Sequence, residues 1–337
     1  MSTARDLATT PGLSQIADVL AAGGDRLADL LERAEGRLGR VAEGYGPALE
    51  GHVSGTLAAG GKRLRPMLVY ISAGESASDD LVAAAVAVEL LHMATLVHDD
   101  VLDVAELRRG QATVFAAGGR EAATATGDLL FSRAFAVLAT TGRPDAVRAL
   151  SDASSALARG ELLQREDAWS RDLPVERYLE RCGLKTARLF AAACRLGALL
   201  GDPGPPAADA LAAFGDRIGL AFQIFDDVLD VSGPVERTGK ARGTDLLDGT
   251  VTLPLILARR ADPAIADVDL RGAVTNAEEA AVLCNRIANT GALDEAREVA
   301  LGHVAAAKDE LRALKALDER QRALLELVAD GVVERYA

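Results

Sequence analysis

The chain contains 337 residues, enough to bury a substantial core in one large domain or two ordinary ones. Apolar residues make up 49% of it and aromatic residues only 4%, so Ala, Leu and Val must build the interior, which favours close-packed helices. The formal net charge of −13 argues against a nucleic-acid partner, because basic surfaces bind phosphate backbones. Small anionic substrates are not excluded, since metal ions can supply positive charge locally.

The three cysteines are Cys182, Cys194 and Cys284, an odd number without C-x-x-C spacing. This pattern predicts buried thiols of a cytosolic protein and neither a disulfide framework nor a structural zinc site. Residues 1–12 resemble a flexible tail and lack the basic start and apolar stretch of a leader peptide. No window approaches about 18 uninterrupted apolar residues, so we expect a cytoplasmic protein with no transmembrane segment.

Helical periodicity runs through the rest of the chain. Apolar positions recur at helical spacing from Ile16, and the glycines at 60 and 61 separate this region from a nearly continuous Ala/Val/Leu run. That run predicts a helix over 81–104, buried on most sides. Further helices are predicted over 121–140, 144–169, 175–200, 206–231, 252–260, 277–290 and 293–333, separated by Gly and Pro clusters. With no comparable strand-like alternation, we expect an all-α fold in which residues 13–337 form a single large helical bundle.

One five-residue element occurs twice. Asp-Asp-Val-Leu-Asp fills both 99–103 and 226–230, each time after a strongly apolar helical run. In a helix, Asp99 lies one turn from Asp103, and Asp226 one turn from Asp230, so each pair of carboxylates repels. Acidic residues near a helix C-terminus also oppose the helix dipole. Local stability therefore gives no reason for the arrangement, whereas Mg²⁺ binding does, because this ion takes one or two carboxylates together with water and substrate phosphates. A single copy would be equally compatible with a solvated acidic turn, but two identical copies favour a metal.

Cations are few, and several stand near glycine. The lysines are Lys62, Lys185, Lys240, Lys308 and Lys315. The segment GGKRLRP at 60–66 combines a flexible turn with three cations able to surround an anion, although it could also be a basic entry to a helix. Arg108 and Arg109 follow the first aspartate cluster and can bind phosphate in a bidentate manner.

Five other polar residues fit the same interpretation, and several of them have ordinary alternatives. Lys185 and Thr186 lie in a helical stretch, where a lysine is usually solvated. Gln223 precedes Asp226 by three residues and could bind a ligand or only a neighbouring helix. His92 lies two helical turns before Asp99 and would by itself be read as a core residue. Lys240 follows the second cluster at a distance compatible with a loop folding back over it.

Taken together, these segments resemble the trans-isoprenyl diphosphate synthase (polyprenyl synthetase) family. The resemblance runs from about Gly60 to Pro254 and rests on GGKRLRP, the first cluster with its RRG, LKTA at 184–187, FQIFDDVLD at 222–230 and GK-x-x-GTDLLDGT-x-TLP from Gly239. It implies a helical fold in which both aspartate clusters face a central active-site cavity, and usually a homodimer.

The resemblance also implies the roles of particular residues. Two to three Mg²⁺ ions per active site, bound by Asp99, Asp103, Asp226 and Asp230, would bridge an allylic diphosphate. Lys62, Arg65, His92 and Arg109 would bind isopentenyl diphosphate, and Arg108, Lys185, Thr186, Gln223 and Lys240 would face the allylic diphosphate. The catalytic set would be Asp99, Asp103, Asp226, Lys185 and Lys240.

The function predicted in this way is that of a magnesium-dependent prenyltransferase that joins an allylic diphosphate to isopentenyl diphosphate. Thr250 stands where many members of the family carry a further lysine, so one expected cation is missing. Ala94 and Thr95, just before the first cluster, are small, which the resemblance links to a product of medium or long chain, although Phe131 is a candidate floor of the cavity.

Other functions fit less well. The alternatives are a geranylgeranyl or farnesyl diphosphate synthase of short product length and a non-catalytic partner subunit, whose aspartates should have been lost. A terpene cyclase should lack GGKRLRP and the second aspartate cluster. A purely structural helical scaffold would not explain the paired acids.

Overall fold

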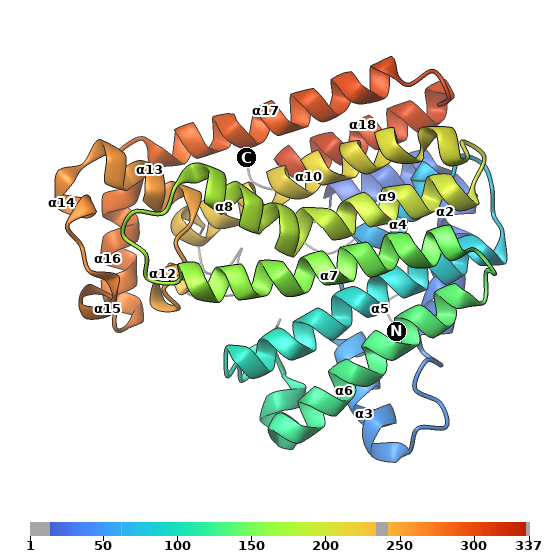
Figure 1. The fold of residues 1–337 in the computed structure, drawn as a ribbon, viewed down its shortest axis with the longest axis horizontal. Helices are drawn as coiled ribbons and strands as arrows, with labels where there is room; N and C mark the ends of the chain where they lie inside the picture. The colour runs from blue at the N-terminus through green and yellow to red at the C-terminus, as the bar shows by residue number, and fades with distance from the viewer. Residues whose placement is uncertain (1–13, 62, 109, 234–241, 335–337) are drawn as a thin grey trace. The chain divides into compact units, whose positions relative to one another are not determined.

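The computed structural model describes residues 14–61, 63–108, 110–233 and 242–334. Nearly all of its regular structure is helical, and the helices in chain order are α2 (Ser14–Leu38), α3 (Pro47–Ala58), α4 (Leu64–Ser72), α5 (Asp79–Leu102), α6 (Val114–Ala139), α7 (Pro144–Asp167), α8 (Val175–Cys182), α9 (Arg188–Leu200), α10 (Pro205–Ser232), α12 (Thr244–Leu247), α13 (Leu253–Ala261), α14 (Pro263–Ala266), α15 (Leu270–Ala273), α16 (Ala277–Ala288), α17 (Ala292–Ala313) and α18 (Glu319–Glu334) (Figure 1). A π-helical turn, η1 (Gly183–Ala187), joins α8 to α9. The predicted all-α fold class is confirmed.

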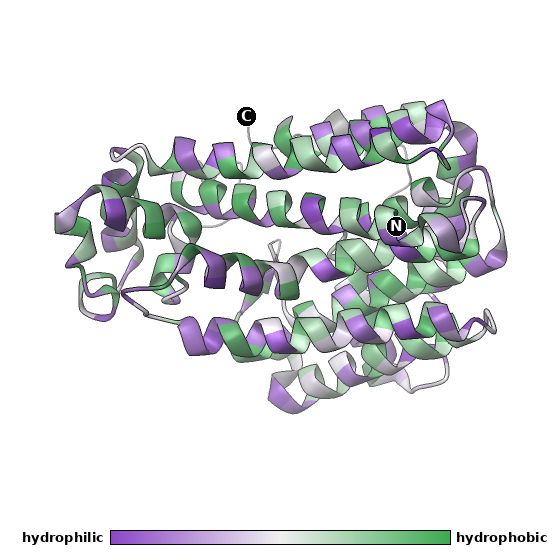
Figure 2. Cartoon of the chain, turned by 45° about the horizontal axis from the view of Figure 1, so that its top comes forward, coloured by the Kyte–Doolittle hydropathy of each residue, from purple (hydrophilic) through white to green (hydrophobic). Residues whose placement is uncertain are grey.

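The described residues group into two compact units. The first contains those within 1–154, 189–213 and 311–328, and the second those within 155–188, 214–310 and 329–337. The prediction that 13–337 form a single domain stays a prediction. Along most helices, hydrophilic and hydrophobic residues alternate in short bands, as expected of amphipathic helices that turn one face to a core (Figure 2).

Helix α5 is the centre of the first unit. Its residues from Leu81 to Leu91 are all buried, and it packs against α2, α4 and, over most of its length, α6. Ser78 starts the helix by accepting the backbone N–H of Leu81 at 3.3 Å, and Asp79 and Asp80 favour the positive end of its dipole. Among the described helices, α5 is the one long and apolar enough to cross a membrane, but 78% of its apolar window is buried inside the protein, as in a core helix.

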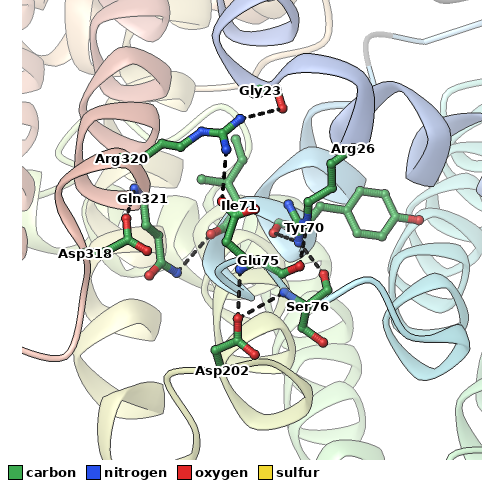
Figure 3. A network of polar contacts seen from close by, with 10 residues as sticks. All are labelled: Gly23, Arg26, Tyr70, Ile71, Glu75, Ser76, Asp202, Asp318, Arg320 and Gln321. Carbon is green, nitrogen blue, oxygen red and sulfur yellow. Dashed lines mark hydrogen bonds and ion pairs between the residues drawn. The ribbon is translucent and has the colours of Figure 1, made fainter.

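A polar network joins distant segments of the first unit (Figure 3). The carboxylate of Asp202 accepts the backbone N–H groups of Glu75 and Ser76 at 2.8 and 3.0 Å. Gly74 precedes this turn with a φ of 72°, and a Cβ there would lie only 3.0 Å from Asp202 Oδ2. The Gln321 side chain of α18 donates to the carbonyl of Ile71 at 3.0 Å. The bonds to Asp202 satisfy two backbone N–H groups that follow α4, and Gln321 adds a donor to the Ile71 carbonyl, which also accepts the N–H of Gly74.

Hydrogen bonds also stabilise helix ends and turns of the second unit. Asn276 caps α16 by accepting the N–H groups of Glu278 and Glu279, each at 3.0 Å. The backbone N–H of Trp169 donates to the carbonyl of Gly249 at 2.8 Å.

All three cysteines of the chain are free and buried, and burial raises the pKa of each thiol to about 12.

The structure differs from the predicted elements in identifiable places. The region before residue 60 contains two helices, α2 and α3, and not one. Gly119, at a φ of 79°, kinks α6 where the sequence predicts a break, but a short helical stretch precedes it, because Thr113 already caps the helix by accepting the N–H of Ala116. A two-residue ribbon, β1 (Leu107–Arg108) paired with β2 (Gln111–Ala112), is too short to leave an alternating pattern.

The predicted helix over 293–333 is also divided into two. Asp318 accepts the backbone N–H of Gln321 at 2.7 Å and thereby starts α18 afresh. The guanidinium of Arg322 meanwhile donates to the carbonyls of Leu311, Leu314 and Leu317 at 3.2 to 3.3 Å. These carbonyls belong to the last turn of α17 and to the connection before α18, where the arginine adds a donor to backbone groups outside the regular helical pattern.

We predict that Asp202→Ala lowers the free energy of unfolding by about 1–3 kcal/mol, because two backbone N–H groups lose a carboxylate acceptor. Asp209→Ala is the matched control, since Asp209 is 88% exposed and pairs with Arg195. Its loss should change stability by less than about 1 kcal/mol. Urea unfolding of both variants measures the difference, and equal effects would contradict the role of Asp202.

Candidate active site

The first aspartate cluster closes the C-terminal end of α5. Asp99 is half-buried and Asp103 is exposed, and the backbone N–H of Asp103 donates to the Asp99 carbonyl at 2.8 Å, which is the last helical bond of α5. The two carboxylates are therefore one turn apart on the same face, as the i, i+4 spacing predicts. Helix α5 has no basic residue in its last turn to pair with these carboxylates. The negative end of the helix dipole also opposes them, so they have no local electrostatic support.

The middle aspartate of the cluster has a different role from its neighbours. Asp100 is only 4% exposed, and its Oδ1 accepts both the Nε of Arg108 at 2.8 Å and its Nη2 at 2.7 Å. The Asp100 carbonyl accepts the N–H of Ala105, and the hydroxyl of Thr113 donates to the carbonyl of Ala105 at 2.6 Å. Asp100 thus fixes the loop between the outer aspartates and α6, and Arg108, predicted to face a diphosphate, is engaged by an internal carboxylate.

A pocket of about 190 Å³ lies in the first unit between α3, α5 and the start of α6. Its lining includes Gly60, His92 and Arg108 among the segments singled out in the sequence, together with His52 and Thr56 of α3. Arg65 instead stacks on the ring of Phe190, 4.6 Å from its centroid. Lys62 and Arg109 lie outside the described residues.

Arg63 forms one wall of this pocket and has an unusual environment. It is 8% exposed, has a positive φ of 48°, and donates from Nη1 to Oε1 of Glu89 at 2.7 Å. Its Nε also bonds Glu35. Burial alone would lower the pKa of Arg63, but the two carboxylates more than offset this and raise it. A backbone conformation that non-glycine residues avoid is therefore held in place by a buried ion cluster.

We predict that Arg63→Met lowers the free energy of unfolding by about 3–5 kcal/mol, because Glu89 would remain buried without its counter-ion. Replacing both Arg63 and Glu89 by methionine should recover part of the loss, since no uncompensated buried charge would then face the cavity. Arg33→Met is the control: Arg33 pairs with Asp79, which is 95% exposed, and such a pair contributes at most about 1 kcal/mol. Urea unfolding distinguishes the three variants. A double variant with a lower free energy of unfolding than Arg63→Met would contradict this account.

The second aspartate cluster lies in α10 and repeats the pattern of the first. Asp226 is exposed and Asp230 half-buried, whereas Asp227 is 4% exposed. Asp227 accepts the hydroxyl of Tyr178 at 2.7 Å and the side-chain amide of Gln223 at 2.8 Å. The Gln223 carbonyl in turn accepts the hydroxyl of Thr186 at 2.7 Å. Two residues predicted to contact a ligand, Thr186 and Gln223, are thereby brought together.

A further carboxylate joins this cluster. The backbone N–H of Asp245 donates to Oδ2 of Asp230 at 3.3 Å, and Gly243 donates to the Asp230 carbonyl at 2.9 Å. Burial, reinforced by the charge of Asp245, raises the pKa of both Asp227 and Asp230 to about 8. Asp245 was missed as a candidate, although its position in the GTD segment of the second unit offered a signal.

These acidic groups fit a divalent cation of the Mg²⁺ type. Within the described residues, no three His, Cys, Asp or Glu side chains converge into a complete metal cage. Mg²⁺ does not require one, because it usually binds one or two carboxylates and fills its other positions with water and phosphate oxygens. The crowding that raises the pKa of Asp227 and Asp230 is what a cation would relieve.

The π-helical turn positions Lys185. Its Nζ bonds Oε2 of Glu161 on α7, and the Nε of Arg165 donates to the other oxygen of Glu161 at 2.9 Å. Gly160 permits this approach, because a Cβ there would lie 2.5 Å from the backbone nitrogen of Lys185. π-Helical turns are frequent at functional sites. Glu161 had no sequence signal of its own, because its partner lies 24 residues away.

Hydrogen bonds hold the backbone around Thr250 in place. Arg181, buried at 2% exposure, donates to the carbonyl of Val251 at 2.7 Å, and the N–H of Thr250 donates to the carbonyl of Asp245 at 2.8 Å. The backbone at Thr250 and Val251 is therefore held by hydrogen bonds although the expected lysine is missing. Lys240 lies outside the described residues.

An all-α fold with two acidic clusters and nearby cations is typical of enzymes that bind diphosphate esters with divalent metal ions. Comparison with known families agrees with this class. The polyprenyl synthetase family model matches residues 47–286. The chain belongs to the polyprenyl synthetase family and is an enzyme that transfers prenyl groups.

Individual relatives share most of the chain. Heptaprenyl diphosphate synthase component 2 of Geobacillus stearothermophilus is 41% identical over 271 residues, covering 80% of this chain and 84% of the relative. Geranylgeranyl diphosphate synthase of Methanosarcina mazei is 35% identical over 285 residues, covering 82% and 86%. The crystal structure of heptaprenyl diphosphate synthase from Staphylococcus aureus aligns with a TM-score of 0.85 at 30% identity, over 92% of this chain and 99% of that one.

Proposed function

We propose that the protein condenses an allylic diphosphate with isopentenyl diphosphate in a Mg²⁺-dependent reaction and releases a longer prenyl diphosphate and diphosphate. The observation that carries the proposal is the common design of the two aspartate clusters. In each, the outer aspartates reach solvent, while the middle one is buried and hydrogen-bonded. Accessible carboxylates one helical turn apart repel one another, and binding a cation would offset this repulsion.

The residue roles follow from the family and from these environments. Asp99, Asp103 and Asp226, assisted by Asp230, bind two to three Mg²⁺ ions. His92 and Arg65, with Lys62 and Arg109, bind isopentenyl diphosphate. Arg108, Lys185, Thr186, Gln223 and Lys240 serve the allylic diphosphate. The internal partners of Arg108 and Lys185, which are Asp100 and Glu161, hold these cations in place before substrate arrives.

The reaction needs no protein nucleophile. The bond between the allylic carbon and the diphosphate oxygen breaks, the double bond of isopentenyl diphosphate forms the new carbon–carbon bond, and a proton leaves to restore a double bond. Bound Mg²⁺ supplies stabilisation of the charge on the departing diphosphate. Cationic side chains such as Lys185 orient this group, and preorganised charges of this kind are usually the largest contribution to catalysis.

We predict that the purified protein, given Mg²⁺, labelled isopentenyl diphosphate and allylic starters of about ten, fifteen or twenty carbons, forms longer prenyl diphosphates, as metal-assisted diphosphate departure requires. Asp99→Ala combined with Asp226→Ala should abolish turnover, and a chelator should abolish it in the wild type. Asp152→Ala, an exposed residue of α7, is the control. Circular dichroism checks that the double variant keeps its helicity. Full activity of that variant would contradict the metal assignment.

Product length is proposed to be medium to long. Thr95 lies one turn before Asp99 on the same face of α5 and is half-buried, whereas Ala94 is fully buried in the core. A small residue at 95 leaves room for a growing chain beneath the first cluster. The similarity to a heptaprenyl synthase component supports this length, while the similarity to a geranylgeranyl synthase keeps a twenty-carbon product as the alternative.

We predict that Thr95→Phe shortens the main product by at least one five-carbon unit, because the ring would fill space that Thr95 leaves open. Thr95→Ser, which keeps the hydroxyl that donates to the His92 carbonyl at 2.8 Å, should leave the product length unchanged. Chromatography of the dephosphorylated products measures both. An unchanged length in Thr95→Phe would place the limit of growth elsewhere, with Phe131 the next residue to substitute.

The enzyme is proposed to act in the cytoplasm as a homodimer. A relative named as component 2 supports one alternative, in which a second subunit is needed. The elongation assay separates the two, because a chain that needs a partner will not elongate any starter by itself.

A further inference from the structure

A buried hydrogen-bond relay runs from α8 through α10 to the π-helical turn. Tyr178 on α8 donates its phenolic proton to Oδ2 of Asp227 at 2.7 Å. Gln223, one turn earlier on α10, donates its amide to Oδ1 at 2.8 Å. Thr186 of η1 donates its hydroxyl to the Gln223 carbonyl at 2.7 Å. The first and last members of the relay lie in consecutive elements, and α10 supplies the two members between them.

The contacts of the relay give each bond its direction. The NH₂ group of Gln223 faces Asp227 and its carbonyl faces Thr186. A carbonyl only accepts, so Thr186 must give its single hydroxyl proton to Gln223. The Thr186 oxygen is left with lone pairs and no proton on its other side. The bond to Gln223 therefore fixes the orientation of the Thr186 hydroxyl.

Tyr178 determines whether this arrangement holds. Its side chain is fully buried, and Asp227 is 4% exposed, so solvent has little access with which to replace the phenol. Without the phenolic donor, one oxygen of a buried carboxylate would lose its bond, and Asp227 would be free to rotate toward another donor. The cation of Arg181 lies 5.5 Å from the Tyr178 ring and also donates to the backbone of Val251, so the ring itself is held in place.

We propose that Tyr178 is a positioning residue of the prenyl transfer reaction, which acts through Asp227 and Gln223 to hold the side chain of Thr186 in one orientation, with its hydroxyl proton directed inward. The proposal rests on the proposed function, in which Thr186 and Gln223 serve the allylic substrate. It divides the second aspartate cluster into two roles. Asp226 and Asp230 serve the metal, while Asp227 connects the protein interior to the π-helical turn.

The chain contains a matched control. Tyr70 is as deeply buried as Tyr178, but its hydroxyl has no hydrogen-bond partner within the described part of the chain. Figure 3 shows its ring directed away from the surrounding polar network. Tyr70→Phe and Tyr178→Phe therefore remove the same atom from equally buried rings, and only the second removes a hydrogen bond.

The first test is steady-state kinetics with an allylic diphosphate and isopentenyl diphosphate. Tyr178→Phe should lower kcat roughly tenfold, the effect of losing one hydrogen bond to a charged group, with KM for isopentenyl diphosphate unchanged. Tyr70→Phe should leave both constants within about twofold of the wild type. In a Thr186→Val background, Tyr178→Phe should have no further effect, because the end of the relay is already missing. Equal effects in both backgrounds would overturn the proposal.

The second test measures the environment of the Gln223 side-chain amide by NMR. With ¹⁵N-labelled glutamine, the side-chain amide resonance of Gln223, assigned from Gln223→Glu, should shift in Tyr178→Phe and stay in place in Tyr70→Phe. An unchanged resonance overturns the relay, and a shifted resonance with wild-type kcat reduces it to a structural contact. These outcomes differ from failure of the proposed function, which would show as a wild type that elongates no starter and would remove the catalytic part of the proposal with it.

Discussion

Two buried aspartates, Asp100 and Asp227, are the constraint on which the candidate site depends. A buried carboxylate is tolerated only when donors satisfy it, and each of these has a partner from another segment: Arg108 for Asp100, Tyr178 for Asp227. The partner fixes the rotation of the helix that carries the cluster. Because neighbouring residues on a helix point in different directions, anchoring the middle aspartate inward turns the outer ones toward solvent.

The proposed function is compatible with so acidic a protein. Lys185 is held by Glu161 and Arg108 by Asp100, so under this proposal both cations are ordered before a diphosphate binds. Such pairs would reduce the entropy lost when substrate binds, because the long side chains are already ordered. The negative charge of the two clusters would be offset by divalent ions, which also bind phosphate oxygens.

The sequence predicted the parts of the site that depend on local spacing. The i, i+4 repeats identified both clusters, and helical periodicity located α5 and α10 to within a few residues. It could not predict Tyr178, whose partner lies 49 residues away, or Glu89, which meets Arg63 across 26 residues, because such contacts depend on how helices pack. The missed β ribbon and the division of 293–333 have a different cause: a single capping aspartate, or four residues of hairpin, is too small a signal against an Ala- and Leu-rich background.

The contrast between the two buried tyrosines shows what burial by itself can and cannot indicate. Tyr70 and Tyr178 are both inaccessible to solvent, and burial raises the pKa of both hydroxyls well above the usual value. Only Tyr178 has its hydroxyl bonded to a member of an aspartate cluster. A buried polar atom without a partner lowers stability and specifies nothing, whereas one that completes a chain of directed bonds fixes the orientation of every group along it. The directed bonds from Tyr178 to Thr186 connect α8 and α10 of the second unit to its π-helical turn.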